Sequence, residues 1–389
     1  MITKISNAKV ITNGKITNDD IYFKEGKIIA LTNESLPFDE LIDAEGNFVS
    51  AGFIDIHTHG AGGADFLDNT PEAFLTAARY HAEHGATAIV PTVTSSTKES
   101  MVDAVKVFEE VKDNNHDGAI LLGLHMEGPY FSLNQKGAQD EKHIRPFTKD
   151  EYTEILSLSD SVLRWTGAPE LDGAEEFGNY LKERGVLPCI GHSDADSDVT
   201  KKAFENGFTH VTHLYSCTSI VHRKNAFRYA GIVETAYLLD DMTVEIIADG
   251  RHLPADLLKL IYKIKGKEKI ALITDSIRGA GMPEGESIIG GKKDGLRVII
   301  EDGVAKLPDR TAFAGSVAMC DRLIRTMINM AEVPLEDAVY MASKTPAEIL
   351  GIENKGDILP GYDADIIIFD EDINIQKTII GGKVVFSEK

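Results

Sequence analysis

Gly52-Phe53-Ile54-Asp55-Ile56-His57-Thr58-His59 is an apolar run that ends in two histidines separated by one residue. In an extended chain, residues two apart point to the same side, so His57 and His59 project together. Two imidazoles on one face of a buried strand end are typical of a divalent-metal site. Two ordinary histidines at a strand–loop junction would look the same, because short spacings recur by chance. Polar groups at the ends of five later strands bear on this choice.

The composition is that of a globular enzyme and excludes two classes of partner. The chain has 389 residues, of which 43% are hydrophobic and 26% charged. Its formal net charge of -22 argues against nucleic acid and against an anionic membrane, because both require a basic surface. A small anionic substrate remains compatible, since it needs only a local cationic pocket.

The cysteines and the N-terminal residues indicate the compartment. Cys189, Cys217 and Cys320 are widely spaced and odd in number, which predicts neither a disulfide framework nor a CxxC metal site. A reducing compartment follows. The first residues lack the apolar segment of a signal peptide, and no apolar run approaches the length of a membrane span. We therefore expect a cytoplasmic protein.

Both ends of the chain have the pattern of short β-strands. Alternating segments near the N-terminus flank an Asn13-Gly14 turn, which is a strong hairpin signal. The C-terminal end contains an apolar strand at residues 365–369 and a hairpin turned at Gly381-Gly382. We predict a small β-sandwich domain assembled from residues 1–50 and 351–389. Hairpins appended to a barrel would produce the same pattern.

The middle of the chain, residues 51–350, is expected to be the metal-dependent catalytic domain. Its strands are nearly continuous apolar runs, as in a parallel sheet covered on both faces. Eight strand–helix units favour an α/β fold of the (β/α)8 TIM-barrel type over an open sheet. The expected strands are 53–56, 86–91, 119–125, 162–167, 186–191, 210–214, 244–248 and 269–274. The expected helices are 71–84, 98–112, 149–156, 173–184, 197–206, 254–264, 317–330 and 334–342. The glycine-rich residues 281–313 predict a hairpin insertion beside the active-site mouth.

In such a barrel the functional groups lie at the C-terminal ends of the strands. Six of the expected strands end in imidazole or carboxylate groups, namely His57 with His59, His125 with Glu127, His192, His213, Asp249 with His252, and Asp275. Each has an ordinary alternative: a carboxylate can cap a helix or turn, and a histidine can bond a carbonyl group in the core. As a set they favour a metal site, because apolar strands do not otherwise end so regularly in such side chains.

These strand ends resemble the ligand pattern of the amidohydrolase superfamily. The shared features are the HxH pair, single histidines on the fifth and sixth strands, and an aspartate on the eighth; Glu127 stands where many members have a metal-bridging lysine carbamate. More narrowly, the chain is similar to the family of N-acetylglucosamine-6-phosphate deacetylases over nearly its whole length. The motifs that carry the similarity are at 51–55, 125–130 (His-Met-Glu-Gly-Pro-Tyr), 136–138, 191–195 (Gly-His-Ser-Asp-Ala), 212–215, 247–250, 274–275 and 314–316.

The resemblance implies a metal-dependent hydrolase that removes the acetyl group from N-acetylglucosamine 6-phosphate in amino-sugar catabolism or recycling. It assigns one divalent ion to Glu127, His192 and His213, and a second to His57 and His59 with Glu127 and Asp275 nearby. One or two ions per subunit are therefore expected. Zinc is the first choice, with iron, manganese or cobalt as alternatives.

The resemblance also implies the catalytic groups. Asp275 matches the acid/base that takes the proton of the attacking water and passes it to the sugar nitrogen. His252 matches the histidine that contacts the acetyl carbonyl, although it could instead be an N-terminal residue of the helix after Pro254. Two alternatives stay open: deacetylation of another N-acetyl sugar phosphate, such as the galactosamine epimer, or of another amide; and a non-catalytic barrel that binds sugar phosphate.

Some residues expected to bind substrate depart from the family pattern. Where the family commonly has Asn-Ala near the phosphate, this chain has Ser216 and Cys217. Gln139, which follows Ala138, stands where many relatives have histidine. These departures bear on the exact substrate more than on the reaction.

Residues 221–228 form a cationic stretch in an acidic protein, which suits a phosphate group. In the family, the arginine that reaches the phosphate comes from the neighbouring subunit. The resemblance therefore implies a homodimer with Arg223, or else Arg228, in this role. A solvated basic loop would have the same composition.

Overall fold

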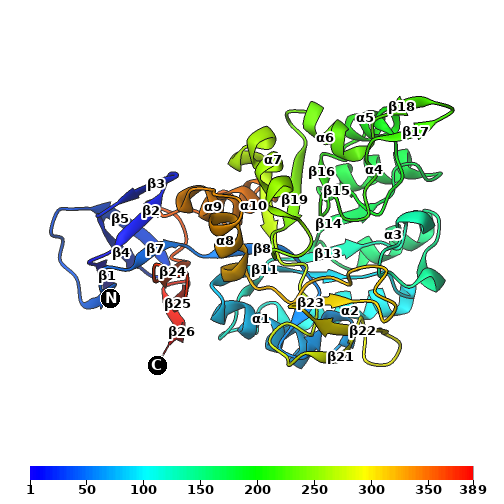
Figure 1. The fold of residues 1–389 in the computed structure, drawn as a ribbon. Helices are drawn as coiled ribbons and strands as arrows, with labels where there is room; N and C mark the ends of the chain where they lie inside the picture. The colour runs from blue at the N-terminus through cyan, green and yellow to red at the C-terminus, as the bar shows by residue number, and fades with distance from the viewer. Residues whose placement is uncertain (389) are drawn as a thin grey trace.

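Residues 1–388 are described by a computed structural model, in which eight parallel strands form a nearly closed barrel (Figure 1). Each strand pairs in parallel with the next. The first and last strands meet where the backbone N–H of Asp275 donates to the carbonyl oxygen of His57 at 2.9 Å. The predicted TIM-type barrel is therefore confirmed. Its strands are β8 (Phe53–Thr58), β11 (Ala86–Val93), β13 (Leu124–Glu127), β14 (Val162–Gly167), β15 (Leu187–Ile190), β16 (His210–Val211), β19 (Thr243–Ile247) and β20 (Ile270–Ile273).

The third barrel strand differs from its prediction over residues 119–125. A short strand, β12 (Ile120–Leu121), pairs with β11, and β13 begins only at Leu124. Gly123 lies in the interruption, where a Cβ atom would come within 2.5 Å of the carbonyl oxygen of Ser161. Only glycine fits so close to another backbone. The resumed strand ends at Glu127 rather than at His125.

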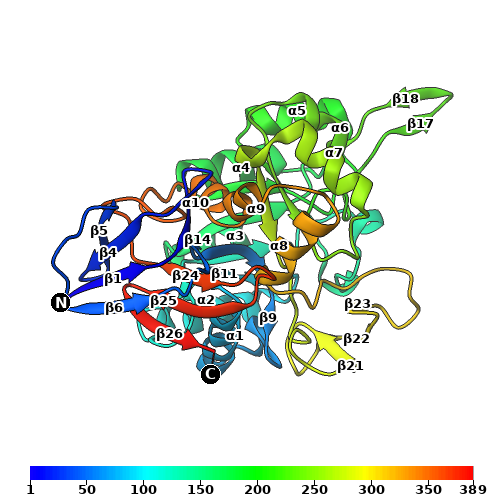
Figure 2. The ribbon, with the colours of Figure 1, turned by 60° about the vertical axis from the view of Figure 1, so that its left-hand side comes forward.

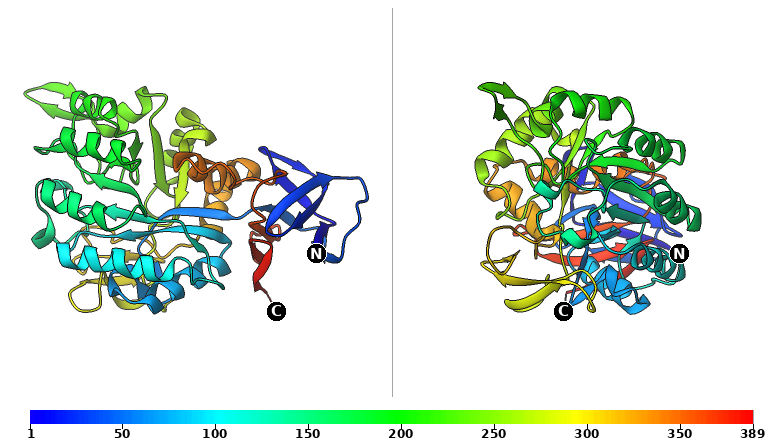
Figure 3. Two further views of the ribbon diagram at one scale, coloured as in Figure 1. Left: turned by 180° about the vertical axis from the view of Figure 1, so that it is seen from behind. Right: turned by 90° about the vertical axis from the view of Figure 1, so that its right-hand side faces the viewer.

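Helices pack around the outside of the barrel (Figure 3). They are α1 (Pro71–Glu83), α2 (Lys98–Val111), α3 (Lys149–Leu158), α4 (Ala174–Glu183), α5 (Ser197–Glu205), α6 (Ile232–Leu238), α7 (Ala255–Lys265), α8 (Cys320–Asn329), α9 (Leu335–Ala342) and α10 (Lys344–Ile349), with 3-10 turns η1 (Phe66–Asp68), η2 (Leu133–Gln135), η3 (Glu141–His143) and η4 (Lys267–Lys269). The eight predicted helices all have counterparts. The sequence did not predict α6 and α10, since 7 and 6 residues are too few for a periodic pattern. Within residues 1–388, no helix is both long and apolar enough to cross a membrane.

Both chain ends contribute to one β-structure beside the barrel (Figures 1 and 2). One sheet has the order β26-β25-β24-β7-β2-β3 and joins the termini through antiparallel pairing of β7 with β24. A second sheet, β5-β4-β1-β6, shares its buried apolar cluster, in which Ile5 and Ile21 meet Val10 and Ile366. The β domain predicted from both termini is confirmed, while its boundaries at 50 and 351 stay a prediction. The strands are β1 (Ile2–Ser6), β2 (Lys9–Thr12), β3 (Lys15–Thr17), β4 (Asp20–Lys24), β5 (Lys27–Thr32), β6 (Glu40–Asp43), β7 (Phe48–Ala51), β24 (Ile366–Phe369), β25 (Ile375–Ile380) and β26 (Lys383–Ser387).

The insertion predicted as a hairpin is a three-stranded antiparallel sheet of β21 (Gly285–Ile289), β22 (Leu296–Glu301) and β23 (Val304–Lys306). Arg278 connects it to the chain segment after the first barrel strand. There β9 (Gly60–Ala61) and β10 (Ala64–Asp65) form a short ribbon. Arg278 Nη2 donates to Asp68 Oδ1 at 2.8 Å and to the carbonyl oxygen of Gly290 at 2.6 Å. The charged and carbonyl groups together hold the insertion beside the barrel mouth.

The cationic stretch is a hairpin of β17 (His222–Lys224) and β18 (Phe227–Tyr229) that projects from the molecule (Figure 2). Asn225 and Ala226 have φ values of 50° and 69°, as a two-residue type I′ turn requires. Phe227 is 71% exposed, so the hairpin presents an aromatic ring as well as cations. The residues of this hairpin are exposed, as the alternative of a solvated basic loop also expects.

A buried ion pair crosses the inside of the barrel. Arg164 Nη1 lies 2.5 Å from Glu245 Oε2, and both side chains are fully buried. Glu245 also accepts from His57 Nδ1 at 2.6 Å and from His210 Nε2 at 3.1 Å. Burial raises the pKa of Glu245, but these cationic and N–H groups outweigh it and hold the pKa well below its ordinary value. The Glu245 carboxylate therefore ties β8 and β16 to β19.

Replacing Glu245 with alanine should lower the free energy of unfolding by about 3–5 kcal/mol, because it leaves the Arg164 guanidinium buried without its counter-charge. Thermal and denaturant unfolding measure the change. Glu286→Ala is the matched control: it removes one partner of an exposed pair with Arg297, and we expect no measurable change. An E245A protein as stable as the wild type would show that the buried pair does not stabilise the barrel.

Candidate metal centre

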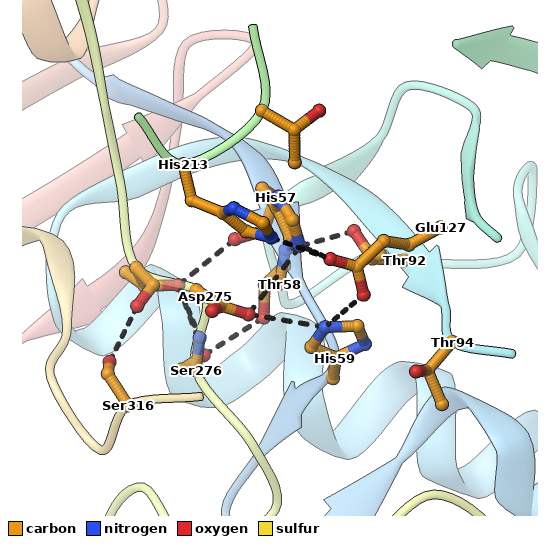
Figure 4. Close-up of polar contacts among 12 residues, drawn as sticks. His57, Thr58, His59, Thr92, Thr94, Glu127, His213, Asp275, Ser276 and Ser316 are labelled. Carbon is orange, nitrogen blue, oxygen red and sulfur yellow. Dashed lines mark hydrogen bonds and ion pairs between the residues drawn. The ribbon is translucent and has the colours of Figure 1, made fainter. Parts of the chain in front are cut away.

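Six side chains predicted as metal or catalytic groups meet at the C-terminal mouth of the barrel, and five of them are labelled in Figure 4. All six are buried. They form two groups, and within each group the ligand atoms lie within 4.8 Å of one another: Glu127, His192 and His213; and His57, His59 and Asp275. Residues far apart in the chain thus converge as the sequence predicts.

Three of these side chains leave their strand ends through left-handed backbone. The φ value is 48° at His192, 30° at His213 and 46° at Asp275. Such conformations cost about 1–3 kcal/mol each in residues other than glycine and persist only where the surrounding structure holds them. Here the backbone N–H of Ser316, for example, donates to the carbonyl oxygen of Asp275 at 2.7 Å. Strain of this kind clusters at functional sites.

Glu127 Oε1 is the common neighbour of three histidines. It lies 3.0 Å from His213 Nε2, 3.3 Å from His192 Nε2 and 3.5 Å from His57 Nε2. Ligand atoms that surround one tetrahedrally bound ion at roughly 2.0–2.2 Å stand roughly 3.3–3.6 Å from each other. The spacing around Oε1 is close to that of an ion's coordination shell.

The other oxygen of Glu127 faces the second group. Oε2 lies 3.3 Å from His59 Nε2, which is itself 3.2 Å from Asp275 Oδ1. His57 Nε2 lies 3.5 Å from the same Asp275 oxygen. These spacings would suit a second ion held by His57, His59 and Asp275.

The orientation of two imidazoles shows why this carboxylate needs a cation beside it. His192 Nδ1 donates to the carbonyl oxygen of Gln135 at 2.8 Å, and His213 Nδ1 donates to that of Ser216 at 3.0 Å. Since a carbonyl oxygen only accepts, each neutral ring presents a lone pair at Nε2. Both lone pairs face Glu127 Oε1, so acceptor faces acceptor unless a positive charge lies between them. Imidazole with carboxylate is a donor set that zinc and related ions favour, so the residues present fit a divalent metal.

The two histidines of the second group differ in the hydrogen bonds that their ring nitrogens make. His57 donates its Nδ1–H to Glu245 Oε1 at 2.6 Å, and its Nε2 has no hydrogen-bond partner in the part of the chain that the structure describes. The same holds for Nδ1 of His59. Buried polar atoms without partners are uncommon and require an explanation. An ion bound between His57, His59 and Asp275 would be coordinated by Nε2 of His57 and would give this nitrogen a partner.

The close approach of these charged and polar groups shifts the pKa values of the site residues. Burial raises the pKa of Glu127, but the four surrounding histidines hold it well below its ordinary value. Burial also raises the pKa of Asp275, but His57 and His59 lower it by more. Burial lowers the pKa of His213, which Glu127 nevertheless raises above its ordinary value. Both carboxylates are thus ionised at neutral pH, which favours a cation.

Five of the six site groups, all except His57, line part of a cavity of about 270 Å³. Five of the predicted substrate residues, Ala138, Gln139, Ser216, Cys217 and His252, line it as well. Arg223 and Arg228 do not, because both lie on the exposed hairpin. Apolar lining residues were not predicted: Tyr215, Ile247, Ile289 and Phe313 come from separate segments and carry no sequence signal of a shared wall.

For two residues that orient the site, the sequence did not predict this role. Asp249 Oδ2 accepts from His252 Nδ1 at 2.9 Å, and Asp249 Oδ1 accepts from the backbone N–H of His252 at 2.8 Å. His252 precedes helix α7, whose N-cap is Pro254, so it is held by Asp249 rather than by the helix. The second residue, Glu245, did leave a signal, since it is the only charged residue in the apolar strand β19.

Comparison with known proteins places the chain in a family. The amidohydrolase family matches residues 48–385. The chain is 33% identical over 337 residues to the N-acetylglucosamine-6-phosphate deacetylase of Vibrio furnissii, covering 86% of this chain and 82% of that protein. It is 32% identical over 391 residues to the enzyme of the same name from Lysinibacillus sphaericus, covering 98% and 97%. The crystal structure of that deacetylase from Pasteurella multocida superposes with a TM-score of 0.92 at 28% identity, over 100% of both chains. The chain belongs to the amidohydrolase family and, within it, to the N-acetylglucosamine-6-phosphate deacetylases.

Proposed function

We propose that this protein is a metal-dependent deacetylase that hydrolyses N-acetylglucosamine 6-phosphate to glucosamine 6-phosphate and acetate, in amino-sugar catabolism or recycling. The observation that carries the proposal is the convergence of Glu127, His192 and His213 beside Asp275 in one cavity. Support also comes from relatives that match over most of the chain and are named for this reaction.

Amide hydrolysis requires an activated water, a polarised carbonyl group and a proton for the leaving nitrogen. Glu127, His192 and His213 would hold a divalent ion, which would lower the pKa of a bound water to about 7 and act as a Lewis acid for the carbonyl. Asp275 is the base, because His57 and His59 keep its carboxylate ionised. Its Oδ1 faces these histidines, which leaves Oδ2 to accept the proton of the water and pass it to the sugar nitrogen.

His252 is the group proposed to contact the acetyl carbonyl oxygen. A hydrogen bond to this oxygen stabilises the transition state if it strengthens as negative charge develops there. Because Nδ1 donates to Asp249, donation from Nε2 requires a ring that is protonated on both nitrogens. Asp249 is then both the counter-charge and the group that fixes the ring.

We propose zinc as the resident ion, with iron, manganese or cobalt as alternatives, because imidazole and carboxylate suit all four. The pairing of His57 and His59 with Asp275 and Glu127 Oε2 supports a second ion per subunit. The three cysteines are free, which supports a reducing, cytoplasmic setting.

The phosphate group needs a cation that the cavity does not contain. Within residues 1–388, no lysine or arginine lines the cavity that holds the metal centre. The exposed hairpin β17–β18 carries Arg223, Lys224 and Arg228 on a projecting arm with an exposed Phe227 at its end. We propose a homodimer in which this hairpin reaches the cavity of the partner subunit, with Arg223 as the first choice for the phosphate and Arg228 as the second.

The first test is acetate release from N-acetylglucosamine 6-phosphate. Chelation should abolish it and zinc should restore it. Asp275→Asn should lower kcat by about 100- to 10,000-fold, because an amide cannot accept the proton. Zinc content of the same preparation shows whether an ion was lost as well. Asp372→Asn, in an exposed turn of the terminal domain, is the control.

A substrate panel accompanies this assay. Turnover of N-acetylgalactosamine 6-phosphate in preference to the glucose epimer would shift the substrate assignment but keep the chemistry. A zinc-loaded protein that hydrolyses no member of the panel would leave a non-catalytic sugar-phosphate-binding barrel as the function.

The hairpin proposal predicts complementation between a variant that binds substrate weakly and a variant that lacks the catalytic carboxylate. Arg223→Ala should raise KM for the phosphorylated substrate with little change in kcat, while Lys224→Ala should have a smaller effect. When R223A and D275N subunits are mixed and allowed to exchange, one site per hybrid dimer combines an intact Asp275 with a partner's intact Arg223. Activity at low substrate should therefore recover toward a quarter of the wild-type level or more. A monomer in solution, or no recovery on mixing, would reject the shared site.

A further inference from the structure

The amide group of Gln139 has three hydrogen-bond partners inside the protein, although the family resemblance implies that it contacts the sugar. Its Oε1 accepts from the backbone N–H of Ser95 at 3.0 Å and from Thr94 Oγ1 at 2.7 Å. Its Nε2 donates to Glu127 Oε2 at 2.9 Å. The side chain is only 7% exposed, so little of it faces the cavity.

These partners determine which way the amide points. A backbone N–H can only donate, so the group opposite Ser95 must be the oxygen of Gln139. The nitrogen then faces Oε2 of Glu127 and donates to it at 2.9 Å. The amide could not turn over without losing the bond to Ser95 and opposing its oxygen to a carboxylate. It is therefore a fixed N–H donor aimed at one oxygen of Glu127.

Glu127 contacts both ligand groups, so the orientation of its carboxylate affects the whole centre. Its Oε1 faces the histidine pair His192 and His213, while its Oε2 faces His59. Besides these imidazoles, the only side chain that bonds the carboxylate among the described residues is Gln139. Groups that hydrogen-bond a metal-ligating carboxylate orient it, and their loss typically weakens metal binding.

We propose that Gln139 is a positioning residue that holds the shared carboxylate Glu127 for the metal, with Thr94 and Ser95 holding Gln139 in turn; the inference rests on the proposed metal-dependent function. It also gives a role to the end of β11, which contributes no imidazole or carboxylate to the centre. That strand ends at Val93, and the next two residues form the bonds to Gln139. The strand end thus acts on the metal through two intermediate side chains.

The positioning role and a sugar-contact role predict different measurements. A positioning residue affects the affinity for the ion, whereas a sugar contact affects KM when the ion is saturating. Gln139→Leu keeps the approximate size of the side chain and removes all three bonds. In the full-length protein it should weaken zinc affinity roughly 10- to 100-fold, measured by competition with a chelator of known affinity. KM for N-acetylglucosamine 6-phosphate at saturating zinc should stay within about twofold of the wild-type value.

Thr94→Val provides a second variant that does not touch Glu127. It removes one of the two bonds to Gln139 Oε1, so zinc affinity should fall in the same direction but by less. The double variant should be no weaker than Q139L alone, since both changes act on one chain of contacts. Gln376→Leu in β25 controls for the loss of a glutamine amide elsewhere and should leave zinc affinity unchanged.

Two outcomes overturn the proposal. Wild-type zinc affinity in Q139L together with a raised KM would make Gln139 a sugar contact. If Q139L does not fold, wild-type zinc affinity in T94V would reject the chain of contacts on its own. A wild-type protein that binds no zinc, iron, manganese or cobalt would instead reject the metal-dependent function, and this inference with it.

Discussion

The structure depends on one electrostatic constraint: a buried carboxylate faces imidazole lone pairs. Backbone carbonyl oxygens of Gln135 and Ser216 fix the protons of His192 and His213 on the nitrogens that point away from Glu127. When both rings are neutral, the two remaining nitrogens direct lone pairs at an ionised oxygen, at 3.3 and 3.0 Å. A bound cation would relieve that arrangement, and the three side chains have the chemistry to hold one.

Buried charged groups inside the barrel, in addition to apolar packing, hold the residues of this centre in place. Glu245 receives the Nδ1–H of His57 and is itself neutralised by Arg164. Its Oε1 also accepts from the backbone N–H of His213 at 3.3 Å, so it contacts elements of both ligand groups. Such a pair is costly to bury, but inside a closed barrel it cannot rearrange toward water. The left-handed backbone at the strand ends is held in the same way, by bonds to neighbouring loops.

The residues proposed to bind the substrate phosphate lie in a different part of the molecule from the residues proposed to carry out the reaction. The ligand groups lie at the ends of barrel strands and are buried, whereas the cations suited to a phosphate lie on a projecting hairpin outside the cavity. An acidic protein with a net charge of -22 would repel an anionic substrate over much of its surface. A localised cationic arm counters this repulsion where it is needed and leaves the metal centre, with its ionised carboxylates, unchanged.

Much of the fold and of the centre follows from the sequence alone. The period of a strand places His57 and His59 on one side, and apolar runs that end in imidazole or carboxylate groups predict both the parallel barrel and its functional mouth. The Asn-Gly and Gly-Gly turns in the two termini predict that these ends are β-structure, which the β7–β24 pairing joins into one domain. These features are local, because each depends on neighbours within a few residues.

What only the tertiary structure decided is which polar atoms face each other. Gln139 donates to Glu127, and Glu245 bonds His57 across 188 residues of chain. The break at Gly123, the third strand of the insertion and the apolar cavity wall depend in the same way on contacts between distant segments. Sequence spacing carries no information on side-chain rotamers or on register between such segments. The identity of the metal-ligating side chains is therefore visible in the sequence, whereas the groups that hold them in place are visible only in the folded barrel.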